Sequence, residues 1–156
     1  MATTIKGKNR GFTLMELMIV VSILAIMASI ALPKYADMLL KATEGTQKGN
    51  LGSLRSALQI YYADNTGIFP SCAVSPGSTV LTDALIPKYI PNIPMVKNGL
   101  HPTTNSVYCD YEIVAGAVHD GQGWYYDGAL PTDSQNGGVF VACDHTDTIG
   151  SSWTNY

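Results

Sequence analysis

A single carboxylate interrupts the longest apolar stretch of the chain. From Phe12 to Leu32 the sequence runs for 21 residues without proline or glycine, and Glu16 is its only charged residue. An ionisable side chain at membrane depth is costly, so a carboxylate there indicates a function and requires a partner. A plain membrane anchor gives no reason for Glu16. We therefore expect this residue to act in contact with a positive group.

The element that positions Glu16 has the length of a membrane-spanning helix. At about 1.5 Å per residue the apolar stretch reaches about 31 Å, which matches the hydrocarbon core of a bilayer. Three basic residues precede it and no acidic residue comes before Glu16. This asymmetry keeps the N-terminus on the cytoplasmic side and sends the rest of the chain outward. The competing interpretation is a secretory signal that is cut after the small residues Ser29 and Ala31.

The start of this stretch resembles a known processing signal. Residues 8–17, KNRGFTLMEL, resemble the class III signal of type IV pilins and of the related type II secretion pseudopilins. The resemblance implies that a membrane peptidase cuts between Gly11 and Phe12 and N-methylates Phe12, leaving the apolar helix in place. Glu16 then pairs with the positive N-terminus of a neighbouring subunit, which sets the stagger between subunits. Filament pilins carry a proline where Pro33 stands, and we expect the helix to kink or loosen there.

The helix is expected to continue beyond the apolar stretch and to end at a clear signal. Leucines and a tyrosine recur at spacings of 3, 4 and 3 and form one helical stripe: Leu51, Leu54, Leu58 and Tyr61. Gly67 provides a C-terminal cap and Pro70 prevents the helix from restarting. Six of the eight prolines lie between Ile68 and Thr104, which favours a connecting loop with one short helix over residues 81–86.

The last third of the chain is typical of a small sheet. Apolar residues alternate over Val107–Ile113, and two further strands are expected over Trp124–Asp127 and Val139–Cys143. The expected fold is α+β, with a long N-terminal helix, apolar in its first half, packed against a small antiparallel sheet. Its segments are a cleaved leader (1–11), the membrane and filament-core half of the helix (12–35), the amphipathic half (36–66) and a globular head (67–156). Within the head we expect a loop over 67–104, the sheet over 105–143 and a C-terminal tail over 144–156 that folds back.

Three cysteines lie in the part of the chain predicted to leave the cytoplasm: Cys72, Cys109 and Cys143. An odd number there indicates one disulfide and one further thiol. In a plain meander the strands of Cys109 and Cys143 are about 9.6 Å apart, whereas a disulfide needs Cα atoms within about 7 Å. We therefore predict that Cys72 is in the bridge and that the remaining thiol is Cys109 or Cys143. A direct Cys109–Cys143 bridge would require another strand order.

Charge and motifs argue against several other functions. The chain from Phe12 onward has six basic and twelve acidic residues, and no basic residue follows Lys97. Binding of nucleic acid by a basic surface is therefore not expected. His101, His119 and His145 invite a hydrolase hypothesis, but no catalytic motif accompanies them, and we predict that the chain is not an enzyme. No Cys or His spacing of a zinc site is present, and no metal-ligating residues are predicted on that ground.

The C-terminal tail offers one further candidate for ligand binding. Asp144 and Asp147 resemble in outline the acidic loop that binds calcium in major pseudopilins. Two carboxylates offer hard oxygen ligands, but calcium usually takes six or more. A solvated acidic loop is the simpler interpretation, so no cofactor is expected beyond calcium at this pair.

The resemblance implies a structural function in a filament. The first hypothesis is a type IV pilus subunit, stored in the cytoplasmic membrane and then polymerised into an extracellular pilus. Its partners would be other copies of itself, the prepilin peptidase, the inner-membrane assembly platform and the membrane. The alternatives are the major pseudopilin of a type II secretion system, in a periplasmic pseudopilus, and a monomeric anchored binding protein.

Overall fold

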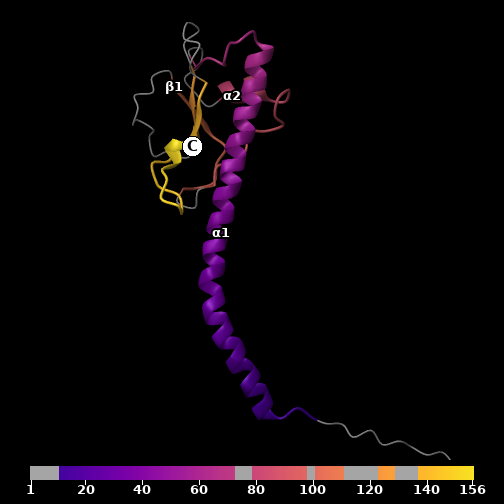
Figure 1. The fold of residues 1–156 in the computed structure, drawn as a ribbon. Coiled ribbons are helices and arrows are strands. Elements are labelled where there is room, and N and C mark those ends of the chain that lie inside the picture. Colours follow the sequence, from indigo (N-terminus) through magenta and orange to yellow (C-terminus); the bar gives the residue numbers. More distant parts are fainter. Residues whose placement is uncertain (1–10, 73–78, 98–100, 111–122, 129–136) are drawn as a thin grey trace, which may run out of the picture. The chain divides into compact units, whose positions relative to one another are not determined.

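The computed structural model describes residues 11–72, 79–97, 101–110, 123–128 and 137–156. Along the chain these residues form two α-helices, three strands and a 3₁₀ helix (Figure 1). The elements are α1 (Leu14–Asp64), α2 (Val80–Leu85), β1 (Val107–Asp110), β2 (Trp124–Asp127), β3 (Val139–Val141) and η2 (Trp153–Asn155). The α+β class predicted from the sequence is confirmed. The chain divides into two compact units, Met1–Leu39 and Leu40–Tyr156, and α1 contributes to both.

Helix α1 is continuous over 51 residues and includes Pro33. The kink or loosening expected at that proline stays a prediction, as do the boundaries proposed for the leader and the two helix halves. The end of the helix agrees with its sequence signal. α1 stops at Asp64, and Gly67 follows with a φ of +84°, a left-handed conformation that glycine adopts without strain. The amide of Gly67 donates to the carbonyl of Tyr62 at 2.9 Å and so satisfies one of the last helical carbonyls.

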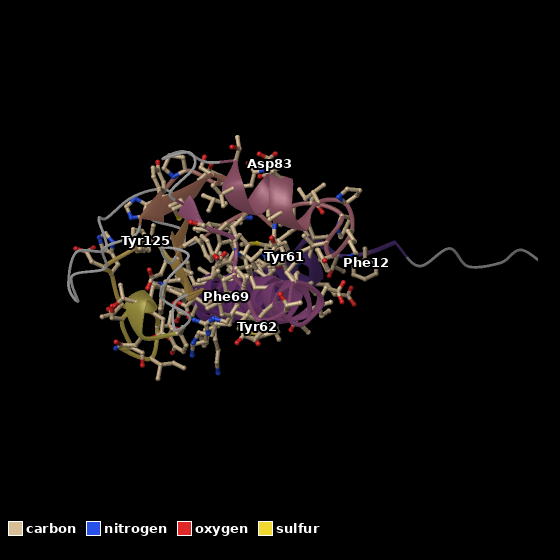
Figure 2. All side chains as sticks on the ribbon, turned by 90° about the horizontal axis from the view of Figure 1, so that it is seen from above. Phe12, Tyr61, Tyr62, Phe69, Asp83 and Tyr125 are labelled. Carbon is tan, nitrogen blue, oxygen red and sulfur yellow. A yellow bond between two sulfur atoms is a disulfide. The ribbon has the colours of Figure 1, made fainter. Side chains whose placement is uncertain are left out.

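The leucine stripe predicted on α1 forms one side of the head's core. Leu51, Leu54 and Leu58 are each at most 3% exposed, and Tyr61 packs against the same cluster. The neighbouring tyrosine, Tyr62, stacks on Phe69 with ring centroids 4.4 Å apart (Figure 2). The aromatic pair holds the first residues of the connecting loop against the last turn of the helix.

The connecting loop predicted from the prolines contacts α1 through hydrogen bonds. The amide of Lys97 donates to the side-chain oxygen of Gln47 at 2.8 Å, and Asn50 donates to the carbonyl of Met95 at 3.1 Å. Farther along, the indole of Trp124 donates to the carbonyl of Pro94 at 2.7 Å. The short helix expected over residues 81–86 is α2, which buries both of its leucines.

The sheet corrects one prediction. Its strand order is β1-β2-β3, as in a meander, but β1 and β2 are parallel and only β2 and β3 are antiparallel. The sheet is therefore mixed and not antiparallel throughout. Alternation of apolar residues predicts which side chains face the core but carries no information about strand direction. A parallel pair needs a connection of about a dozen residues or more, and thirteen residues separate β1 from β2.

The core-facing residues of the three strands lie opposite one another, and β1 keeps the alternation predicted for it. Val107 and Cys109 of β1 are opposite Trp124 and Tyr126 of β2, and these are opposite Val141 and Val139 of β3. All except Cys109, which is partly buried, are at most 2% exposed. The strand predicted to reach Ile113 is described to Asp110, and its last residues lie outside the described part of the chain.

Candidate functional site

The first residues of the described chain form a helix start built around Glu16. Gly11, Phe12 and Thr13 precede the helix, and the hydroxyl oxygen of Thr13 accepts a hydrogen bond from the amide of Glu16 at 3.2 Å. Thr13 is thus the N-cap of α1, three residues before a glutamate, which is the spacing of a capping box. The negative charge of Glu16 also lies in the first turn, where the helix dipole favours it. Cleavage between Gly11 and Phe12 would leave this start intact.

The side chains around Glu16 are apolar and exposed. In the described part of the chain one helix, α1, is long and apolar enough to cross a membrane, judged by length and composition alone. None of its most apolar stretch is buried. Two hydroxyl groups in this stretch bond within the helix, Ser22 to the carbonyl of Met18 and Ser29 to that of Ile26. The exposed large residues of this segment include Phe12, Leu14, Leu17, Ile26, Ile30 and Leu32. An apolar surface of this length requires lipid or other apolar helices to cover it.

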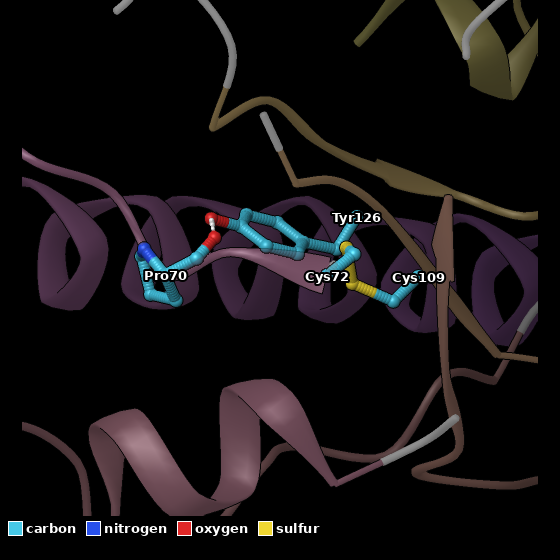
Figure 3. The surroundings of a disulfide bond; sticks show 4 residues. All are labelled: Pro70, Cys72, Cys109 and Tyr126. Atoms are coloured by element: carbon cyan, nitrogen blue, oxygen red, sulfur yellow. Dashed lines mark hydrogen bonds between the residues drawn. A yellow bond between two sulfur atoms is a disulfide. The ribbon is translucent and has the colours of Figure 1, made fainter. Parts of the chain in front are cut away.

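The disulfide of the head joins Cys72 to Cys109 (Figure 3). This confirms the prediction that Cys72 is in the bridge. The two Cα atoms are 5.8 Å apart, within the normal range for a disulfide. Cys143 lies outside this bridge and is fully buried. Beside the bridge, the hydroxyl of Tyr126 donates to the carbonyl of Pro70 at 2.7 Å, and burial raises the pKa of that hydroxyl. Together these bonds attach the loop after α1 to the strands β1 and β2.

The C-terminal tail is attached to α1 through Asp147. One carboxylate oxygen accepts from the ammonium of Lys48 at 2.8 Å and from the hydroxyl of Tyr156 at 2.7 Å. The other accepts from the amides of Ile149 and Ser151, each at 2.9 Å. The hydrogen bonds from Lys48 and then Tyr156 hold the pKa of Asp147 well below its ordinary value. The tail therefore folds back as predicted, with an ion pair at its centre.

The acidic pair does not offer two equivalent calcium ligands. The side chain of Asp147 has no exposed surface, whereas that of Asp144 is 66% exposed. Both carboxylate oxygens of Asp147 already accept hydrogen bonds, one of them from the ammonium of Lys48. A calcium ion at Asp147 would have to displace that ammonium. Calcium binding at Asp144 and Asp147 stays a prediction, and the contacts of Asp147 already give it a structural role.

A second contact set holds the tail on the helix. The guanidinium of Arg55 donates to the carbonyl of Val139 at 2.8 Å and to the carbonyl of Tyr156. Glu44 accepts from the amide and the hydroxyl of Thr148 at 2.8 and 2.5 Å. Trp153 is 2% exposed and belongs to the core cluster. Sequence reasoning missed these partners. The lack of basic residues after Lys97 could have indicated that basic residues of the helix bind the tail.

Three side chains with metal-ligating atoms gather at the end of β3. One potential ligand atom from each of His101, Cys143 and His145 lies within 4.8 Å of the others. The sulfur of Cys143 lies 3.3 Å from Nδ1 of His145. Sequence reasoning missed this cluster, because two of its members are two residues apart and the third is far away in the chain. The Cys-x-His spacing at the end of a strand is the only sequence signal for it.

A family model places the start of the chain in a defined class. The model described as the prokaryotic N-terminal methylation motif matches residues 6–32, which contain Gly11, Phe12 and Glu16. Together with the exposed apolar helix and the small α+β head, this match defines a protein of the methylated pilin class. No solved structure matches the chain.

Curated relatives identify the family within that class. The chain is 34% identical over 105 residues to the type IV major pilin protein PilE of Neisseria gonorrhoeae, a match that covers 67% of this chain and 62% of that protein. It is 39% identical over 96 residues to a fimbrial protein of Neisseria meningitidis, covering 62% and 55%. A type IV major fimbrial protein, FimA of Dichelobacter nodosus, is 37% identical over 59 residues, 38% of each chain. The matched regions thus span less than two thirds of these relatives. The chain belongs to the type IV pilin family.

Proposed function

We propose that this chain is a structural subunit of a type IV pilus. The apolar half of α1 holds it in the cytoplasmic membrane, and the same half forms the filament core after assembly. The observation that carries this proposal is the methylation motif at the start of a helix whose apolar side chains are exposed. Lipid and neighbouring helices can both cover such a surface, which allows one segment to serve in storage and in assembly.

Glu16 supplies specificity that apolar contacts lack. Between Phe12 and Pro33 the chain contains no basic residue, so no side chain of this segment can neutralise the carboxylate. Cleavage after Gly11 creates a positive amine four residues before Glu16 in every subunit. Apolar contacts alone allow two such helices many axial offsets. A pair between the amine of one copy and Glu16 of the next fixes one of these offsets.

The partners and location follow from this assembly. The subunit binds other copies of itself, is processed by the prepilin peptidase and is handled by an inner-membrane assembly platform. It is in the cytoplasmic membrane before assembly and outside the cell afterwards. Its function is structural and not enzymatic. The relatives reported above are named as pilins and fimbrial proteins, which favours a pilus over a secretion pseudopilus. The ion pair between Asp147 and Lys48 gives the acidic tail a structural contact within the subunit.

A paired substitution tests this proposal. Glu16→Ala removes the carboxylate within the apolar stretch, and Asp37→Ala removes an exposed carboxylate farther along the same helix. Each variant is expressed in a pilus-forming host that lacks its own major pilin. Surface material is sheared off, imaged by electron microscopy and sequenced from its N-terminus. We expect filaments of chains beginning at methylated Phe12 from the wild type and from Asp37→Ala. Glu16→Ala should be processed and retained in the membrane without normal filaments.

Three results would contradict the proposal. Normal filaments from Glu16→Ala would remove this residue from the assembly mechanism. A mature N-terminus at Leu32 would indicate a classical secretory signal. Wild-type chain that is processed at Phe12 but never found in filaments would support a monomeric anchored protein. Gly11→Val should leave an uncut precursor, because a β-branched side chain should not fit a peptidase site shaped for glycine.

A further inference from the structure

The cluster at the end of β3 combines the two side-chain types that zinc prefers. His101 comes from the end of the connecting loop, whereas Cys143 and His145 follow β3 directly. Two imidazoles and one thiol are ligands for borderline and soft metal ions, whereas calcium and magnesium take oxygen. The chain contains three histidines and three cysteines, and three of these six residues meet here.

The distances in the cluster are close to those around a bound metal. Zinc bonds of about 2.3 Å to sulfur and about 2.05 Å to nitrogen, at tetrahedral angles, keep sulfur and nitrogen about 3.6 Å apart. The sulfur of Cys143 and Nδ1 of His145 are 3.3 Å apart, close to that value. The imidazole rings of His101 and His145 meet edge to face, with centroids 5.2 Å apart. No ligand atom is more than 4.8 Å from another. Rotation of the partly buried imidazole rings can therefore bring all three ligand atoms within bonding distance of one ion.

The backbone around two of the ligands is held in place. The amide of Cys143 donates to the carbonyl of Val141 at 2.8 Å, and the carbonyl of His145 accepts from the amide of Trp153 at 3.1 Å. Cys143 has no exposed surface, and both histidines are partly exposed. The sulfur therefore lies on the inner side of the cluster and the imidazoles on the outer side. This arrangement gives a metal ion an entry path from solvent and a dry thiolate ligand.

We propose that His101, Cys143 and His145 bind one zinc ion. On binding, a zinc–sulfur bond forms and the thiol proton of Cys143 goes to solvent, so the affinity rises with pH. Three protein ligands leave a fourth position for water or for Asp144, whose carboxylate is 3.4 Å from Nδ1 of His145. The ion would cross-link the connecting loop to the tail. It would cross-link the small head in addition to the disulfide. This proposal does not depend on the filament proposal.

Cobalt substitution tests the site directly. The full chain is purified in detergent micelles with its disulfide intact and titrated with Co²⁺. We expect one equivalent to produce the visible bands of tetrahedral cobalt and a thiolate-to-cobalt charge-transfer band in the near ultraviolet. Zinc should remove both sets of bands, and calcium should not. Cys143→Ser should abolish the charge-transfer band. His101→Asn and His145→Asn should each weaken cobalt binding at least about tenfold.

A matched control uses the third histidine. His119→Asn removes the third imidazole of the chain, which is not one of the proposed ligands, and should leave the cobalt spectrum unchanged. Because Cys143→Ser can disturb a buried position, the two histidine variants and a second measurement keep the test independent of folding. In the wild type, zinc should slow alkylation of the Cys143 thiol at least about tenfold, and a chelator should restore the rate. The proposal fails if cobalt gives no charge-transfer band, if zinc does not protect the thiol, or if His119→Asn abolishes binding.

Discussion

Reduction of the Cys72–Cys109 disulfide should strongly destabilise the head. The bridge closes a loop with a sequence separation of 37 residues. In the chain-entropy model, opening a loop of that length releases about 13 cal/mol/K in the unfolded state, which is about 4 kcal/mol at room temperature. A head of this size has a modest core, so a loss of that magnitude is a large part of its stability. We therefore expect the reduced head to remain folded only marginally.

The best comparison is the wild-type chain with and without its disulfide. Reduction leaves every side chain in place, whereas substitution of the buried Cys72 also removes packing. Cys72→Ala/Cys109→Ala should reproduce the loss and add a small packing term. The control is Cys143→Ala, which removes the third cysteine and leaves the bridge intact. It should lower stability much less than reduction does.

Tryptophan fluorescence provides an assay specific to the head. The chain has two tryptophans, Trp124 and Trp153, and both are at most 2% exposed in the head. Urea unfolding of the full chain in micelles therefore reports on the head and not on the membrane segment. With an m value of about 2 kcal/mol/M, the expected loss moves the midpoint down by about 2 M. An unchanged midpoint after reduction, or a non-reduced peptide map with Cys143 in the crosslink, would refute the reasoning.

Two further predictions use the same assay. Tyr126→Phe removes the hydroxyl that donates to Pro70 and leaves a buried carbonyl unsatisfied, so the head should lose about 1–3 kcal/mol, and an unchanged midpoint would contradict this. Asp147→Asn should lower stability at neutral pH and flatten the acid limb of the stability profile. Its carboxyl has a depressed pKa in the folded head, because of Lys48 first and Tyr156 second, so its contribution is present above about pH 4 and is lost as the pH falls further. Urea midpoints between about pH 7 and 2 measure this difference, and parallel profiles for the two chains would contradict the assignment.

Much of the helix and its surroundings could be predicted from local signals. The leucine stripe at 51, 54 and 58 indicates its buried face, and Gly67 marks its end, because each signal depends on the periodicity or conformation of the backbone. The distance between the first and third strands of a meander correctly favoured Cys72 as a member of the disulfide.

Relations between distant segments could not be predicted in the same way. The direction of β1 relative to β2 depends on the path of the connection between them, and alternation of apolar residues is identical for either direction. The meeting of His101 with Cys143 and His145 depends on where the connecting loop packs. Neither feature has a periodic signal, so both required the tertiary structure.

Two acidic residues, Glu16 and Asp147, pose the same electrostatic problem in different parts of the chain. Asp147 is buried in a region without basic residues, since none follows Lys97, and its cation comes from the helix as Lys48. Glu16 lies in a segment without basic residues between Phe12 and Pro33. A carboxylate removed from water needs a cation from elsewhere, whatever the segment. For Asp147 that cation lies within the subunit, and the tail docks on the helix. For Glu16 the amine of another subunit can provide that cation, and the same requirement then favours contact between subunits.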